Sequence, residues 1–112
     1  MVQRPLKVNL RQHARMFSAL GDETRLGIIA RLCKNQPLSL VELTHGTRLT
    51  RQAVTKHLRV LERARIVHGV RAGRESLFEL DPKPIADLKA YLELVSEQWD
   101  QALARLKAAV ES

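Results

Sequence analysis

The sequence is poor in the features that mark secreted, membrane-spanning and single-strand-binding proteins. Its 112 residues include one cysteine, Cys33, so no disulfide can form within the chain. Aromatic residues make up 4%, too few for the stacking platforms that bind single-stranded nucleic acid. There is no run of 18 apolar residues, so we expect no membrane partner. Residues 1–8, which contain Pro5, lack the apolar core of a signal peptide. We predict that they form a loose arm and that the protein is cytoplasmic.

Residues that could perform catalysis or bind metal are also sparse. No nucleophile–base pair, glycine-rich phosphate loop or carboxylate dyad is recognisable, so we predict that the chain is not an enzyme. Four histidines lie in four different predicted elements, and we interpret each as a surface or flanking residue: His13, His45, His57 and His68. Cys33 is predicted to pack as a small hydrophobe. Without Cys and His at ligand spacing, we predict no metal site and no cofactor.

The basic residues, in contrast, are concentrated. Residues 48–74 contain eight Lys or Arg and one acid, Glu62, for a net charge of +7 that equals that of the whole chain. Residues 1–47 carry +4 and residues 75–112 carry −4. A face that is merely solvated usually mixes both signs, whereas a segregated basic block is typical of surfaces that bind phosphate. The block therefore predicts nucleic-acid binding.

Residues 38–63 show the pattern of two helices joined by a tight turn. Ser39 followed by Glu42 forms a capping box, which predicts a helix from Leu40. Thr50 can cap a second, longer helix. The apolar residues of this second helix fall on one face, and the opposite face carries Gln52, Lys56, Arg59 and Arg63. A capped basic helix after a turn is the helix-turn-helix pattern that enters the DNA major groove.

Two helices are predicted before this motif. The first, over residues 9–20, has an apolar stripe at Leu10, Ala14, Phe17 and Leu20, and Gly21 is expected to end it in the left-handed conformation. The second begins after a capping Asp22, and its expected buried stripe is Leu26, Ile29, Leu32 and Cys33.

After the motif, residues 66–80 are predicted to form a two-stranded hairpin. Ile66 to Val70 is one extended run, Leu77 to Leu80 is the other, and the turn between them spans residues 71–74. Such a hairpin, directly after the recognition helix, is a wing. Arg71 and Arg74 would lie at its tip and reach a phosphate or the minor groove, although charge at a hairpin tip can also serve only solubility.

Residues 83–111 are predicted to form one long helix, with the prolines of its first turn at positions that need no N–H donor. Its apolar residues follow heptad spacing for more than three repeats. The helix would be about 43 Å long, whereas a compact domain of this size has a radius of gyration of about 13 Å. Part of this apolar seam therefore requires another partner, and a second copy of the chain is the simplest one.

Taken together, these stretches resemble the ArsR (arsenic repressor-like) family of dimeric winged helix-turn-helix regulators. The similar segments are residues 17–25 (FSALGDETR), 54–61 (VTKHLRVL) and 73–80 (GRESLFEL), and the match runs from about residue 12 to residue 105. The C-terminal part resembles the branch without metal ligands, often paired with START-like hydrophobic-ligand proteins. The resemblance implies a mainly α winged helix-turn-helix fold in a single domain, residues 1–112, with a two-stranded β-wing and a terminal dimerisation helix.

The chain also departs from the family pattern. Residues 40–44 have no cysteine pair, and the C-terminal helix has Asp87 but no histidine, so both of the family's usual metal sites lack donors. Arg48 and Arg65 stand where the family usually has glycine. Each is expected either at positive φ, at a cost of about 1 kcal/mol, or in a turn of different geometry.

We predict a homodimeric repressor of transcription that binds double-stranded operator DNA without sensing metal. The side chains expected at base edges are Arg51, Gln52, Thr55 and Lys56; those expected at phosphates are Thr50, Arg59, Arg71 and Arg74, with His57 at the edge of this surface. The expected dimer interface is Phe17, Leu88, Leu92, Val95, Trp99, Leu103 and Leu106. A small-molecule effector is compatible with the sequence but not identified by it. The alternative is a helical adaptor that binds an acidic protein, which would show little salt-dependent affinity for DNA.

Overall fold

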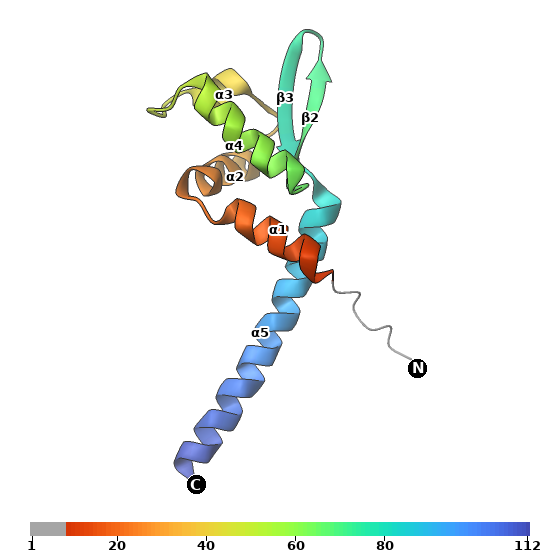
Figure 1. Cartoon of the computed structure of the whole chain (residues 1–112). Helices are drawn as coiled ribbons and strands as arrows, with labels where there is room; N and C mark the ends of the chain where they lie inside the picture. Colours follow the sequence, from red (N-terminus) through yellow and green to blue (C-terminus); the bar gives the residue numbers. More distant parts are fainter. Residues whose placement is uncertain (1–8) are drawn as a thin grey trace, which may run out of the picture.

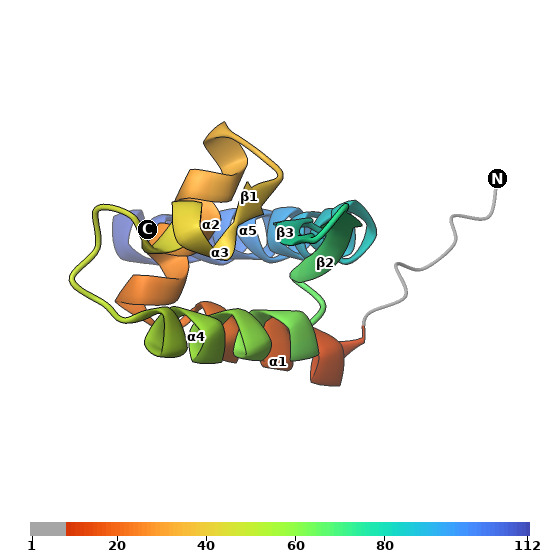
Figure 2. The same cartoon turned by 90° about the horizontal axis from the view of Figure 1, so that it is seen from above.

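The computed structural model describes residues 9–112, so the arm predicted for residues 1–8 lies outside the described part. In chain order the elements are α1 (Leu10–Leu20), α2 (Glu23–Lys34), β1 (Leu38–Ser39), α3 (Leu40–Thr44), α4 (Arg51–Arg63), β2 (Val67–Ala72), β3 (Glu75–Leu80) and α5 (Pro82–Glu111). Helices α1 to α4 and the sheet form a head from which α5 projects (Figure 1). Seen from above, α1 and α4 lie on one side of the head, and α2, α3 and β1 lie on the other (Figure 2).

The core of the head is built around the apolar face of α4. Val54, Leu58 and Leu61 are fully buried, as the sequence pattern predicted. Each of these side chains contributes about 1.5–3 kcal/mol by leaving water. Around them pack buried residues from α1, α2, β1, α3 and β2, from the segment between α4 and β2, and from the start of α5: Met16, Ala19, Ile28, Leu32, Leu38, Leu43, Ala64, Ile66, Val67 and Leu88.

The predicted stripes of the first two helices are only partly correct: Leu32 is buried and Leu20 and Ile29 pack against the core, but the other members are exposed. The buried residues of α1 are His13, Met16 and Ala19, whereas Leu10 and Phe17 are exposed. His13 is therefore a core residue and not a surface residue. Its ring stacks on Tyr91 of α5 with a centroid distance of 4.6 Å. Both faces of α1 carry apolar residues, so tertiary packing and not periodicity decides which face is covered.

In α2 the buried residues are Ile28 and Leu32, one turn apart, while Leu26 and Cys33 are exposed. The packing predicted for Cys33 is therefore wrong. Asp22 caps this helix as expected, since its carboxylate accepts a hydrogen bond from the backbone N–H of Arg25 at 3.0 Å. Gly21 has φ −76°, so the predicted left-handed end of α1 is also wrong.

The sheet has three antiparallel strands in the order β1-β3-β2, where the sequence predicted two. The additional strand pairs Leu38 with Phe78 and Ser39 with Leu77. The β2–β3 hairpin is also longer than predicted: Arg71 and Ala72 belong to β2, so the turn is shorter. Because β1 pairs with β3 and directly precedes α3, the wing is connected to the start of α3.

Two turns bear on the departures from the family pattern. Arg65 has φ +64° and is the only non-glycine residue of the described chain at positive φ. Arg48 does not adopt such a conformation; Gly46, two residues earlier, has φ +81° instead. Of the two expected alternatives, Arg65 therefore takes positive φ, whereas Arg48 does not.

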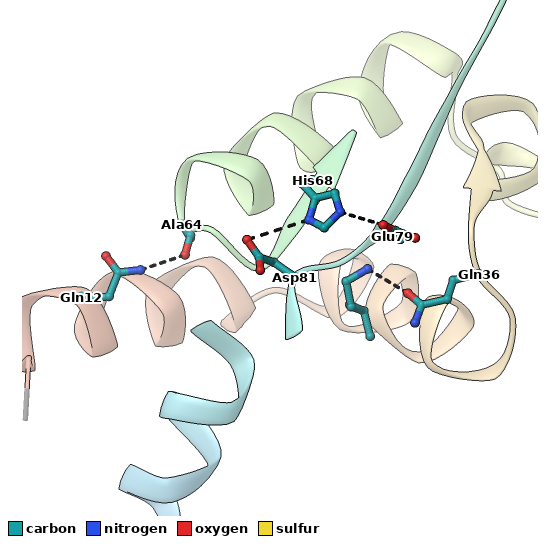
Figure 3. A network of polar contacts seen from close by, with 7 residues as sticks. Gln12, Gln36, Ala64, His68, Glu79 and Asp81 are labelled. Atoms are coloured by element: carbon teal, nitrogen blue, oxygen red, sulfur yellow. Dashed lines mark hydrogen bonds and ion pairs between the residues drawn. The ribbon is translucent and has the colours of Figure 1, made fainter. Parts of the chain in front are cut away.

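Polar contacts fix the base of the wing (Figure 3). His68 of β2 lies with Nε2 2.8 Å from Oε1 of Glu79 on β3 and Nδ1 3.8 Å from Oδ2 of Asp81, which precedes α5. The backbone N–H of Leu80 donates to Oε1 of Gln36 at 2.8 Å. These contacts hold the hairpin, the start of α5 and the segment before β1 together.

Helix α5 has 30 residues, about 45 Å at 1.5 Å per residue. The radius of gyration is 18.3 Å, against about 13 Å for a compact chain of this length. The predicted protrusion of the C-terminal helix beyond the head is therefore confirmed.

Candidate nucleic-acid interface

Helix α3, the first of the motif, is held at both ends. Its capping box is present: the N–H of Ser39 donates to Glu42 Oε1 at 3.0 Å, and the N–H of Glu42 donates to Ser39 Oγ at 3.1 Å. The hydrogen bond from the Ser39 N–H, aided by the hydroxyl, lowers the pKa of the Glu42 carboxyl. At the other end, Arg31 of α2 donates to the carbonyls of Leu43 at 2.8 Å and His45 at 3.3 Å. A cation here satisfies carbonyls that have no partner within the helix. No sequence signal singled out Arg31 for this role.

Helix α4 begins as predicted. Thr50 caps it by accepting a hydrogen bond from the N–H of Ala53 at 3.1 Å. The Thr55 hydroxyl donates to the carbonyl of Arg51 at 2.7 Å, so its oxygen and methyl remain for an outside contact. Four long polar side chains of this helix are exposed: Arg51, Gln52, Lys56 and Arg59.

His57 differs from these neighbours because it lies against α2. Its Nδ1 is 3.2 Å from a guanidinium nitrogen of Arg25 and 3.8 Å from Oδ2 of Asp22, and its side chain is 24% exposed. The Nε of Arg25 donates to the carbonyl of Ala19, near the end of α1. The hydrogen bond from the Arg25 backbone N–H and the charge of its side chain lower the pKa of the Asp22 carboxyl. One guanidinium thus joins the end of α1 to the middle of α4.

The wing presents its arginines to solvent. Arg71 lies in β2 opposite Ser76, and Arg74 lies in the turn beside Gly73, whose φ is +63°. Glycine adopts this conformation without the clash that a side chain would cause. The hairpin can therefore turn tightly, and both arginines are exposed.

A groove of about 310 Å³ lies between α4 and the hairpin. Its walls bring together Thr55 and Arg59 from α4 and Arg71 from β2, and Glu62 is its one acidic residue. The groove therefore brings together a basic residue of the helix and a basic residue of the wing, and residues 16 positions apart in the sequence line the same depression.

The residues predicted for the dimer interface fall into two groups. Leu88 is 7% exposed and belongs to the core of the head, and Val95 is half-buried. The others are exposed apolar side chains: Phe17, Leu92, Trp99, Leu103 and Leu106, with Trp99 63% exposed. Phe17 lies beside α5, with its ring centroid 6.3 Å from that of Tyr91. The exposed members from α5 follow the projecting part of that helix.

Across residues 9–112, no group of three or more His, Cys, Asp or Glu side chains could hold a metal ion. Among these residues, too, no helix combines the length and apolar character that crossing a membrane requires.

The helix-turn-helix, its basic second helix and the adjoining wing define a winged helix-turn-helix DNA-binding protein. A family model described as a helix-turn-helix domain matches residues 20–70. The helix-turn-helix-type transcriptional regulator Rv2034 of Mycobacterium tuberculosis is 36% identical over 98 residues, which are 88% of each chain. The chain belongs to the ArsR family of transcriptional regulators.

Solved structures agree with this assignment. An ArsR-like transcriptional regulator from Rhodococcus sp. RHA1 superposes with a TM-score of 0.73 at 32% identity, over 87% of this chain and 91% of that one. The homodimeric winged helix-turn-helix domain Mb0332 of Mycobacterium bovis superposes with a TM-score of 0.64 at 22% identity, over 83% and 85% of the two chains. The relatives are transcriptional regulators and not enzymes.

Proposed function

We propose that this chain is a homodimeric repressor that binds a specific operator in duplex DNA and is not released by metal. The observation that carries the proposal is the surface that α4 and the wing share, with Thr55, Arg59 and Arg71 around one groove. Duplex DNA offers both the phosphates and the base edges that such a surface requires.

The base contacts are assigned to Arg51, Gln52, Thr55 and Lys56, in the N-terminal half of α4. The first helical turns of a recognition helix enter the major groove, where an amide or guanidinium can pair with a base edge. The exposure of the three long side chains supports this assignment. Thr50, Arg59, Arg71 and Arg74 would then bind phosphates on either side.

The dimer is assigned to α5 together with Phe17. A row of exposed apolar side chains along a projecting helix is costly in water, and a second copy would cover it. Pairing would also set the distance between two recognition helices, which must be about 34 Å to enter successive major grooves. The homodimeric neighbour of the same fold supports this arrangement.

We infer the absence of metal sensing from the side chains that could act as metal ligands. Residues 40–44 contain no thiol, α5 contains no histidine, and Cys33 is the only cysteine of the chain. Zinc, cadmium and arsenite require thiolate or imidazole donors at ligand spacing. Any effector would then be another kind of small molecule.

Selection of binding sites from random duplex DNA tests the proposal. We expect a palindromic sequence whose half-sites lie about 10 base pairs apart, bound with an affinity that falls steeply with salt. A promoter carrying that sequence should be silenced in a reporter assay when the protein is present. Failure to enrich any sequence, with weak and salt-insensitive DNA binding, would favour the adaptor that binds an acidic protein.

A further inference from the structure

We propose that Arg25 and His57 are positioning residues that fix recognition helix α4 against the end of α1, and that His57 acts through Nδ1 on Arg25 and not on DNA. The inference rests on the proposed operator contact by α4. It assigns a role to Arg25, which lies outside the helix-turn-helix.

The geometry determines which atoms act. The guanidinium nitrogen of Arg25 is 3.2 Å from His57 Nδ1, within hydrogen-bond distance. Asp22 Oδ2 is 3.8 Å from the same Nδ1, which is too far for a hydrogen bond. Arginine can only donate, so Nδ1 must accept, and the ring proton of the neutral imidazole is on Nε2. The histidine is thereby held in one tautomer and one orientation.

Arg25 is itself held from two sides, which makes it a suitable support. Its Nε donates to the carbonyl of Ala19 near the end of α1, and its backbone N–H donates to the carboxylate of Asp22 at 3.0 Å. The side chain therefore contacts α1 and α4, while the backbone N–H of the same residue contacts the cap of α2. Because Arg25 bridges these elements, α4 is fixed by a directional contact as well as by its apolar face.

The apolar face alone fixes the rotation of α4 less sharply than a hydrogen bond does. Val54, Leu58 and Leu61 bury α4 against the core and oppose large rotations about the helix axis, but nonpolar contacts are not directional, so they oppose a small roll less. His57 follows Lys56 directly, and a small roll would move Lys56 and Gln52 together relative to base edges. The hydrogen bond from Arg25 opposes this roll. Its loss should reduce discrimination between sequences more than it reduces contact with phosphates.

Two amide substitutions of His57 distinguish the ring nitrogens. Asparagine places its oxygen near the position of Nδ1, where it can accept from Arg25, whereas glutamine places its amide near Nε2, where it could reach DNA. Operator and random-duplex affinities would be measured for His57→Asn, His57→Gln and His57→Leu in the full chain. Each measurement would be made at several salt concentrations, with thermal melting of each variant.

We expect His57→Asn to retain operator affinity within about 3-fold, and His57→Gln and His57→Leu to lose about 10-fold. All three should bind random duplex DNA nearly as the wild type does, with an unchanged salt slope. Arg25→Lys should cost a similar factor on the operator. Its combination with His57→Leu should cost little more than either alone, since both remove the same contact.

The reverse ranking, with His57→Gln active and His57→Asn inactive, would place Nε2 on DNA and overturn the inference. Additive losses in the double variant, or equal losses on operator and random DNA, would also overturn it. If the wild type shows no preference for any sequence, the proposed operator binding itself fails. That result is distinct from every outcome in the variants.

Discussion

At the scale of single residues, Gln52 and Lys56 test whether α4 contacts base edges of the operator. They are exposed one helical turn apart. We expect Gln52→Ala or Lys56→Ala to lose about 1–3 kcal/mol on the operator and little on random duplex DNA, because a lost base contact affects only the matched site. Affinity measurements on both DNAs check this, with Lys107→Ala on the distal part of α5 as a control. Equal losses on both DNAs would mean that these side chains contact only phosphates.

Glu42 makes a second prediction at this scale. Its folded-state pKa lies below the usual value of about 4.3, because the Ser39 N–H and hydroxyl stabilise the carboxylate. The stabilisation is present above the unfolded pKa and is lost as the pH falls through the lower, folded value. Glu42→Gln should therefore reduce stability at pH 7 and flatten its decline between about pH 5 and 3. The free energy of unfolding, measured with urea at several pH values across this range, checks the prediction. Glu93→Gln, at an exposed position of α5, is the control. Parallel acid profiles for wild type and Glu42→Gln would contradict the assignment.

Single-residue predictions from the sequence succeeded where the signal is local. The capping residues Ser39, Asp22 and Thr50 act on N–H groups three positions away, and all three caps are present. His13 was misread because burial depends on which face of α1 meets α5. Arg31 could not be found in advance, since its acceptors lie 12 and 14 residues along the chain.

At the scale of elements, the wing can be tested through salt dependence. Arg71→Ala combined with Arg74→Ala should weaken binding to all DNA. The slope of log affinity against log salt should flatten by about 1.8, since each phosphate contact contributes about 0.9. Titrations between 50 and 200 mM salt, roughly the range in which such slopes are resolved, provide the measurement. Lys83→Ala with Lys89→Ala removes the same charge from α5 and should leave the slope close to that of the wild type. An unchanged slope in the wing variant would remove the wing from the interface.

The elements themselves were predicted unevenly. Helices with a clear apolar period appear where the sequence placed them, both α4 with its Thr50 cap and α5 with prolines in its first turn. Strand β1 was missed because two residues carry no periodicity, and its pairing with β3 depends on a partner about 40 positions away. The covered faces of α1 and α2 could not be read from the sequence either, because both helices carry apolar residues on more than one side.

At the scale of the whole molecule, Trp99 tests the proposed dimer. Its side chain is 63% exposed on the projecting helix, so its burial would require another chain. Truncation of a buried Trp commonly costs about 3–5 kcal/mol, and in a symmetric dimer the change occurs twice. Trp99→Ala should therefore make melting strongly concentration-dependent and abolish operator binding without removing a DNA contact.

Sedimentation at roughly micromolar protein concentration measures whether the variant and the wild type are monomers or dimers. Glu97→Ala, on an exposed position of the same helical segment, is the control and should remain dimeric. A folded wild-type monomer that binds a palindromic operator one-to-one would refute the dimer.

Response to metals is the second test at this scale. Stoichiometric zinc, cadmium or arsenite should not release the operator, because the chain lacks thiolate and imidazole donors at ligand spacing. A fluorescence titration of the protein–DNA complex with each metal gives the measurement. Release by any of them that disappears in Cys33→Ser or in a histidine variant would show that a site exists.

The uncovered apolar side of α5 has a consequence for gene dosage. If the apolar side of this helix is covered only in the dimer, most of the chain is monomeric at low expression. The concentration of dimer then rises with the square of the amount of chain synthesised. Halving expression would then reduce operator occupancy by about fourfold, whereas a self-sufficient monomer would lose about half. A helix longer than the head that carries it would in this way turn a small change in protein level into a steep change in transcription.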